Sequence, residues 1–491
     1  MRHLGEALAA AGYTDDGVAG LLGPVAHGAL SRNEATPGLR ATGDGSPLAT
    51  LTRLWPLQAP VAAGALEAAL PDLVPDLVDL GLLERSGGQV RALVDVRPHA
   101  DGDREWWVLS DLTPGLDGHN LRVAAAHVLG ISSASTSLAR LTVRDRVDRA
   151  LDLGTGCGVQ ALHLAAHAGE VVATDVNERA LWLTRLNVEL NAGHDGVDRI
   201  EVRRGNLYQP VQAEQFDLIV TNPPFVISPA TEEPLVYRDS GLPGDEVVRR
   251  VVTGAPGHLR PGGRCQVLAN WVIQRGRDWD ERLAGWVAGS DCDVWAVQRE
   301  VLDPAQYVEL WLKDAGVHGT EEYPRRYDAW LAWFEEQGVG SVGFGWLNLH
   351  RTDRADPVLR FEEWPYDVEQ PIGPEVTALG ARVQLDRSLD DAALLASRLL
   401  ARSDVRQETV GEPGAEDPER IVLRQQRGLR RARTVDTVEA GLVGACDGDL
   451  AVGQILDALG TLLGNDAEAM REGYLPVVRE LLVEGYLTPG A

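Results

Sequence analysis

The chain has 491 residues, of which 44% are hydrophobic, and it carries a formal net charge of −27 with Lys313 as its only lysine. This length allows two to four domains, taking about 100–200 residues for each, and no run approaches the roughly 18 apolar residues of a membrane span or the pattern of a secretion signal. We therefore expect a cytoplasmic globular protein that does not use a membrane, and its negative charge disfavours binding to long nucleic-acid duplexes.

Residues 1–104 favour a small helical or winged-helix-like domain. Alanine and leucine recur at helical spacing over residues 51–83, the pair Gly87 and Gly88 makes a turn, and "QVRALVDV" then alternates as a strand does. Amphipathic helical patterns return in "DLAVGQILDALGTLL" and "LPVVRELLVEGYLTPG" near the C-terminus. We expect residues 371–491 to form a C-terminal α/β extension that ends in a second winged-helix-like unit.

Residues 105–370 alternate between short β-type runs and helical runs. This alternation predicts one Rossmann-like α/β domain with seven mostly parallel strands. The β-type runs are residues 149–154, 169–176, 199–206, 216–224, 263–273, 292–302 and 342–352. Nine of the thirteen tryptophans lie between Trp271 and Trp364, and we interpret them as core packing, with an aromatic substrate pocket as the alternative.

A glycine-rich turn, Gly154-Thr155-Gly156-Cys157-Gly158, joins the first of these strands to a helix. Glycines let a ligand approach the backbone, and the free N–H groups of a helix start attract an anion. Asp175 ends the next strand, where a carboxylate can accept hydrogen bonds from both hydroxyls of a ribose. The pattern indicates a nucleoside ligand, and Val159 in place of the third glycine of the nicotinamide fingerprint disfavours a dehydrogenase.

A second motif, Asn222-Pro223-Pro224-Phe225, follows the strand "FDLIVT" at its carboxyl end, where open α/β sheets bind ligands. The two prolines lock their φ angles and remove two N–H donors, which leaves a rigid turn rich in acceptors. The amide oxygen of Asn222 and the carbonyl of Pro223 can then hold one –NH2 group. Phe225 offers a flat face for a planar substrate.

Asp152 precedes the first glycine by two residues, and the resulting D-x-G-x-G-x-G resembles the methionine-binding loop of class I S-adenosylmethionine (SAM) methyltransferases. The resemblance implies SAM as cofactor, with Gly154 and Gly156 along its methionine end and Asp175 on its ribose. Asn206 stands where the family usually has an aspartate facing adenine. The implied cofactor-binding residues are Asp152, Gly154, Thr155, Gly156, Gly158, Asp175, Val176, Asn206, Leu207 and Asn222. The four scattered cysteines lack metal-type spacing, so we expect reduced thiols and no metal site.

Residues 150–264 resemble, more closely, the N-methyltransferases with an Asn-Pro-Pro-aromatic motif, which act on glutamine amides or on adenine and guanine amino groups. The implied catalytic residues are Asn222, Pro223, Pro224 and Phe225. An amide or exocyclic amine is a poor nucleophile because its lone pair is conjugated. Two acceptors that hold its N–H bonds out of plane direct that lone pair at the methyl carbon. In related enzymes the region before the first strand closes over the cofactor, so we expect residues 127–136 to line the pocket, with helix capping as the alternative.

Three functions remain open from the sequence. The favoured one is methylation of a base of ribosomal or transfer RNA, with phosphate contacts from two arginine groups. The alternative for these arginines is pairing with the abundant acids. The groups are Arg140, Arg144, Arg146 and Arg149, and Arg424, Arg427, Arg430, Arg431 and Arg433. The other functions are methylation of a glutamine amide in a protein, and a SAM-binding regulator without transferase activity, which the intact Asn222 motif disfavours.

Overall fold

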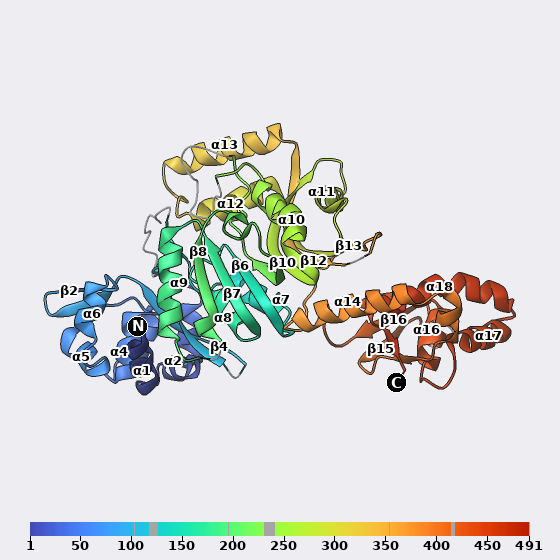
Figure 1. The fold of residues 1–491 in the computed structure, drawn as a ribbon, viewed down its shortest axis with the longest axis horizontal. Coiled ribbons are helices and arrows are strands. Elements are labelled where there is room, and N and C mark those ends of the chain that lie inside the picture. The colour runs from blue at the N-terminus through green and yellow to red at the C-terminus, as the bar shows by residue number, and fades with distance from the viewer. Residues whose placement is uncertain are drawn as a thin grey trace. The chain divides into compact units, whose positions relative to one another are not determined.

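The computed structural model describes residues 1–102, 104–116, 126–194, 196–229, 241–352, 354–413 and 418–490. The chain forms two compact units (Figure 1). The first comprises Met1–Ala139 and Asp145–Pro365, and the second comprises Arg140–Arg144 and Tyr366–Ala491. The N-terminal region therefore groups with the central sheet, and our three-part division at residues 104 and 370 remains a prediction.

The N-terminal region joins helices to a small sheet of strand order β1-β3-β2. The turn at Gly87 and Gly88, both with positive φ, connects the antiparallel strands β2 and β3, and the winged-helix-like character of this region remains a prediction. A separate antiparallel hairpin, β4 with β5, leads toward the central sheet. The elements are α1 (Arg2–Ala10), α2 (Asp15–Leu30), α3 (Thr36–Ala41), α4 (Pro47–Leu54), β1 (Val61–Ala62), α5 (Ala63–Ala69), α6 (Val74–Asp79), β2 (Leu83–Ser86), β3 (Gln89–Ala92), β4 (Asp95–Asp101) and β5 (Arg104–Ser110).

The central sheet has eight strands in the order β13-β11-β12-β10-β9-β6-β7-β8. They are β6 (Val147–Leu153), β7 (Ala168–Asp175), β8 (Ile200–Arg204), β9 (Phe216–Thr221), β10 (Leu259–Gln274), β11 (Cys292–Leu302), β12 (Val339–Arg351) and β13 (Leu359–Glu363). All seven predicted strands are present, and only β12 runs antiparallel to its neighbours. This confirms the Rossmann-like sheet, to which β13 adds an unpredicted edge strand.

Helices surround this sheet, as Figure 1 shows. They are α7 (Ser133–Leu141), α8 (Val159–Ala165), α9 (Glu178–Leu190), α10 (Glu246–His258), α11 (Trp279–Val287), α12 (Pro304–Asp314) and α13 (Glu322–Glu336). Val248 and Val251 of α10 and Leu283 of α11 join Phe216 and Trp271 of the strands in one buried core. Burial of each such side chain contributes about 1.5–3 kcal/mol. All four cysteines are buried and unbonded to one another, as expected.

The register of the sheet brings the two sequence motifs together. Leu153, the last residue of β6, pairs with Thr174 of β7 on one side and with Thr221 of β9 on the other. The glycine-rich turn and Asn222 therefore both begin one residue after this row. Strand β6 leads to β7 on one side while β9 lies on its other side, so the row is the point at which strand order reverses. Open sheets bind ligands at the carboxyl ends of such strands.

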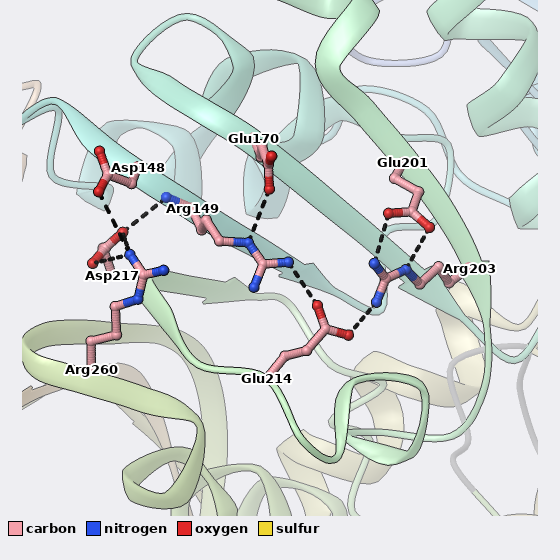
Figure 2. Close-up of polar contacts among 8 residues, drawn as sticks. All are labelled: Asp148, Arg149, Glu170, Glu201, Arg203, Glu214, Asp217 and Arg260. Carbon is pink, nitrogen blue, oxygen red and sulfur yellow. Dashed lines mark hydrogen bonds and ion pairs between the residues drawn. The ribbon is translucent and has the colours of Figure 1, made fainter.

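An ion-pair network lies across the strands β6 to β9 (Figure 2). The Arg149 guanidinium donates to Glu170 at 3.0 Å and to Glu214 at 2.7 Å, and Arg203 also donates to Glu214. The Asp217 carboxylate accepts a bond of 2.8 Å from the backbone N–H of Arg149. Arg149 is therefore paired with acids in the structure, which agrees with the alternative to a phosphate contact.

We expect Glu214→Gln to lower the free energy of unfolding by about 1 kcal/mol at neutral pH, because Arg149 and Arg203 each lose one of their two carboxylate partners. Hydrogen bonds from Arg149 and Arg203 lower the pKa of Glu214 below its usual 4.5. A carboxylate with a depressed folded pKa stabilises the protein above its unfolded pKa, and this stabilisation is lost as the pH falls through the folded value. The Tm difference from wild type should therefore be full at pH 7 and close below about pH 4.

Glu170→Gln is the matched control, because it removes one ion pair from a side chain that is 66% exposed. Such pairs contribute little to stability. Equal Tm losses at pH 7 in both variants, measured by thermal unfolding, would contradict the prediction.

The second unit is a smaller α/β assembly with its own core, in which Leu442, Leu456, Leu481 and Tyr486 are buried together. Its three-stranded sheet has the order β15-β16-β17, and β14 pairs with β18. The elements are α14 (Gly373–Ser388), α15 (Asp391–Ala396), β14 (Leu399–Ala401), β15 (Val405–Val410), β16 (Arg420–Gln425), β17 (Ala432–Val435), α16 (Thr437–Ala445), α17 (Val452–Leu463), α18 (Ala467–Glu484) and β18 (Leu487–Pro489). Within the described ranges, no helix is both long enough and apolar enough to cross a membrane.

Candidate active site

A cavity of about 710 Å³ opens at the carboxyl ends of β6, β7, β8 and β9. Its lining includes every predicted catalytic or cofactor-binding residue except Gly158. From the predicted cofactor set these are Asp152, Gly154, Thr155, Gly156, Asp175, Val176, Asn206, Leu207 and Asn222, and from the catalytic set Asn222, Pro223, Pro224 and Phe225. Residues more than 70 positions apart in the sequence thus share one cavity, of a size that suits a small-molecule ligand.

Hydrogen bonds to Asp152 hold the glycine-rich turn. Its Oδ2 accepts a bond of 2.6 Å from the Thr155 hydroxyl and one of 2.9 Å from the N–H of Ala161 in α8. Asp152 is 1% exposed, and this burial raises its pKa to about 7. The two hydrogen bonds that Asp152 accepts fix the conformation of the turn and the start of α8.

The glycines of the turn differ in their surroundings. Gly154 and Gly156 have positive φ, and a Cβ at either would meet no atom within 4 Å, since both border the cavity. Gly158 also has positive φ, but a Cβ there would lie 2.9 Å from Cγ2 of Thr184. The predicted cofactor contact of Gly158 therefore has no counterpart in the cavity lining, because this glycine packs against α9.

Asp175 lies between the turn and the next helix. Its Oδ2 accepts a bond of 3.0 Å from the Gly156 N–H, and its Oδ1 accepts one of 2.9 Å from the Asn177 N–H. Each carboxylate oxygen keeps acceptor capacity for a further donor. Burial raises the pKa of Asp175 above its usual value. This geometry places two acceptor oxygens side by side, as recognition of two neighbouring hydroxyls requires.

The loop after β8 forms another part of the cavity wall. Asn206 is exposed, and Leu207 has a φ of 47°, which is unusual for a residue with a side chain. Backbone strain of this kind concentrates at binding and catalytic loops, where the surrounding structure holds it in place. The loop presents a polar amide beside an apolar side chain, which fits a flat heterocycle with an amino group.

Asn222 lines the cavity with its amide group poised as an acceptor. Its Oδ1 is buried and has no hydrogen-bond partner among the described residues. An unpaired buried acceptor costs about 1–3 kcal/mol, so its presence points to a ligand donor. The preceding Thr221 donates its hydroxyl hydrogen to the Leu153 carbonyl at 2.6 Å, which ties the motif to β6. Pro223 is buried, and Phe225 is half-buried at the cavity.

The segment before the first strand borders the cavity through residues 126–130, Ser132, Ala134 and Ser135. The Asp111 carboxylate accepts a bond of 2.8 Å from the N–H of Val128, and the Asn177 side chain donates to the Ala126 carbonyl at 3.0 Å. Ser132 and Ser135 exchange side-chain bonds with each other's N–H groups at the start of α7. The structure thus combines the two roles that the sequence left as alternatives.

Sequence reasoning missed the contribution of α10 and its approach, which add Leu242, Val247, Arg250 and Val251 to the lining. The Nε of Arg250 donates to Glu246 at 2.8 Å, one helical turn earlier. The i,i+4 spacing of acid and base was visible, but nothing local indicated which face of the helix would meet the cavity. No tryptophan of the described ranges lines it, so the tryptophans agree with core packing.

The C-terminal arginine run is also largely engaged with acids. Arg424 donates to Glu408 at 2.7 Å and 3.1 Å, and Arg433 contacts Glu439, Glu480 and Glu484. Arg431 is only 6% exposed. Arg424 and Arg433, like Arg149, take the alternative of pairing with acids, whereas Arg431 is buried. Phosphate contact remains a prediction for the rest of the two groups, which are Arg140, Arg144, Arg146, Arg427 and Arg430.

Known proteins resemble the region that holds this cavity. A family model described as the methyltransferase small domain matches residues 130–277. Two models described as domains of unknown function match residues 10–93 and 381–489. The ribosomal protein uL3 glutamine methyltransferase of Bordetella pertussis is 32% identical over 213 residues, which cover 39% of this chain and 68% of that relative. The chain belongs to the class I SAM-dependent methyltransferases of the Asn-Pro-Pro-aromatic group.

Two further relatives match shorter parts of this methyltransferase. The release factor glutamine methyltransferase of Xylella fastidiosa is 35% identical over 148 residues, 28% of this chain and 49% of the relative. The ribosomal RNA small subunit methyltransferase C of Alcanivorax borkumensis is 28% identical over 154 residues, 31% of this chain and 42% of the relative. The methyltransferase thus spans about half the length of these two relatives. SAM is the cofactor of the family, and the cavity residues fit it through the glycine-rich turn and the paired acceptors of Asp175.

Proposed function

We propose that the protein transfers the methyl group of SAM to a planar amide or amino nitrogen held by Asn222. The single observation that carries this proposal is the buried Oδ1 of Asn222, which borders the cavity and has no partner in the described part of the chain. Asp175 would bind the ribose, the glycine-rich turn would face the methionine end, and Asn206 and Leu207 would meet the adenine. These roles rest on the family and on cavity position.

SAM, when bound, would supply an electrophilic methyl group and leave as the neutral thioether when its carbon–sulfur bond breaks, and the methylated nitrogen would release one proton to water. Asn222 Oδ1 and the Pro223 carbonyl accept the two N–H bonds of the acceptor group and turn its lone pair toward that methyl. Phe225 packs against the plane of the acceptor, which restricts its rotation. The contribution of these residues is orientation of the nitrogen, which requires no strong base.

We propose a glutamine amide of a translation protein as the acceptor. The net charge of −27 and the pairing of Arg149, Arg424 and Arg433 with acids leave fewer cations for an RNA backbone. Arg250, beside the cavity, is paired with Glu246 as well. The relatives named as uL3 and release factor glutamine methyltransferases support the same choice. Such an acceptor agrees with the cytoplasmic location and the absence of a membrane partner expected from the sequence.

A base of ribosomal RNA is the second candidate, as the sequence analysis favoured. The match to ribosomal RNA small subunit methyltransferase C supports it. A planar exocyclic amine would meet the same two acceptors and the same aromatic face.

The deciding experiment offers purified protein and tritiated SAM, separately, to ribosomal protein uL3, release factor and small-subunit ribosomal RNA. Label in a protein that survives nuclease treatment supports the glutamine amide, and label in RNA supports the second candidate. SAM binding without transfer to any of the three would favour the regulator and count against both.

A further inference from the structure

The connection between β11 and β12 is much longer than its geometry demands. These strands are antiparallel neighbours, and such strands can be joined by a two-residue hairpin. Residues 303–338 instead form α12 and α13. Asp303 caps α12 by accepting from the N–H of Gln306 at 2.9 Å, so the helix has a defined start. The added helices therefore serve something other than chain reversal.

Both helices form hydrogen bonds to Ile227, two residues after the Asn-Pro-Pro-Phe motif. The N–H of Ile227 donates to the Tyr307 Oη of α12 at 2.8 Å. The carbonyl of Ile227 accepts a bond of 3.0 Å from the Trp330 indole N–H of α13. Both backbone polar groups of one residue are thus satisfied by aromatic side chains from an insertion.

The surroundings of Ile227 make these two bonds difficult to replace. Ile227, Tyr307 and Trp330 are each 0% exposed, so water cannot take over a lost bond. They belong to one buried cluster, which Phe225 joins from its edge. The Phe225 ring packs edge-on against Trp311 of α12, with 6.1 Å between ring centroids. The concentration of aromatics in this region thus forms a core directly beside the motif.

We infer that Tyr307 and Trp330 are positioning residues for Asn222 and Phe225. On the N-terminal side of the motif, Thr221 is bonded to the Leu153 carbonyl of the sheet. On its C-terminal side, Ile227 is bonded to α12 and α13. Pro223 and Pro224 have no N–H, so the motif itself offers few donors for anchoring bonds. The inference rests on the proposed function, because orientation matters when the acceptor nitrogen must meet the methyl group at one angle.

The test uses the full-length variants Tyr307→Phe and Trp330→Phe, which each remove one bond to Ile227. Tyr307→Phe also removes the acceptor of the Asn270 side-chain N–H, at 3.3 Å, so Trp330→Phe is the cleaner of the two. Their matched controls are Tyr13→Phe and Trp107→Phe. Tyr13 Oη donates to the Val96 carbonyl at 2.6 Å and the Trp107 indole N–H donates to the Tyr13 carbonyl at 2.7 Å, both buried and outside the cavity lining. Tm, SAM affinity by calorimetry and the rate and KM of transfer to the labelled acceptor are measured for all four.

We expect Tyr307→Phe and Trp330→Phe to lower the rate of transfer at saturating SAM and acceptor roughly tenfold, since small misplacements of reacting groups are costly. SAM affinity should stay within about twofold, because both variants misplace the acceptor nitrogen and leave the residues assigned to SAM unchanged. The controls should lose similar Tm and keep their rate. Unchanged rates in the first pair, or equal rate losses in the controls, would overturn the inference.

A failure of the proposed function can be distinguished from a failure of this inference. If the wild-type protein methylates none of uL3, release factor and small-subunit RNA, the proposed reaction is in doubt, and hydrogen exchange decides the anchoring. The peptide that contains Ile227 should exchange faster in Tyr307→Phe than in wild type and should be unchanged in Tyr13→Phe. Equal exchange in Tyr307→Phe and wild type would overturn the inference regardless of activity.

Discussion

Asn222→Ala should slow methyl transfer by about 100-fold or more while SAM binding is retained, as loss of one preorganised polar contact typically does. The contact matters mainly when the nitrogen reacts, so its loss appears in the rate at saturation. The measurement is single-turnover transfer with SAM in excess. Asn222→Asp keeps an acceptor oxygen and should retain part of the rate.

The stability of this variant separates catalysis from a purely structural turn. Asn222 Oδ1 has no partner among the described residues, and removal of an unpaired buried acceptor costs no hydrogen bond. Tm should therefore stay level or rise in Asn222→Ala, whereas a structural turn predicts that Tm and rate fall together.

Asn206→Ala is the control for Asn222→Ala, because the two variants should have opposite effects on SAM affinity and on the rate. It replaces another cavity-lining amide, which we assign to the adenine. Its effect should be weaker SAM affinity with a normal rate at saturation. Near-wild-type transfer in Asn222→Ala would refute the catalytic role.

Asp175→Ala should weaken SAM binding roughly 10- to 100-fold, since it removes one or two charge-assisted hydrogen bonds of about 1.5–3 kcal/mol each before compensation by water. It also frees the Gly156 N–H, which the carboxylate now holds at 3.0 Å, so the turn loses a constraint. Calorimetry measures the affinity. Because burial raises the pKa of Asp175, wild-type affinity should begin to fall at a higher pH than for an exposed aspartate as the solution is acidified.

Asp217→Ala is the matched control for this variant. Asp217 is also a strand aspartate that accepts a backbone N–H, from Arg149 at 2.8 Å, and it adds an ion pair to Arg260 at 2.9 Å. It lies at the start of β9 and outside the cavity lining, whereas the cavity lies at the carboxyl ends of the strands. Its loss should lower Tm and leave SAM affinity unchanged. Unchanged affinity in Asp175→Ala would remove the ribose assignment.

The sequence by itself determined the sheet and the residues at its carboxyl edge. Short β-type runs between helical runs are local signals, and all seven predicted strands occur. Parallel strands end at one edge, so Gly154, Asp175 and Asn222 were expected to meet there, and Leu153 pairs with Thr174 and Thr221 as that requires. Of the predicted catalytic and cofactor-binding residues only Gly158 lies outside the cavity lining, since it packs against Thr184, a contact that no local pattern encodes.

Only the tertiary structure decided which distant groups surround these residues. Tyr307 and Trp330 lie 80 and 103 positions from Ile227, and their sequence looked like ordinary amphipathic helix. The sequence around Arg149 and Arg433 predicted phosphate contacts, whereas the fold pairs both side chains with acids. For Arg250 the acid partner Glu246 is local, and only the fold decided that this pair borders the cavity. The physical reason is that a hydrogen bond or an ion pair depends on a partner brought near by the whole fold, whereas strand formation and the glycine turn depend on the residues of the segment itself.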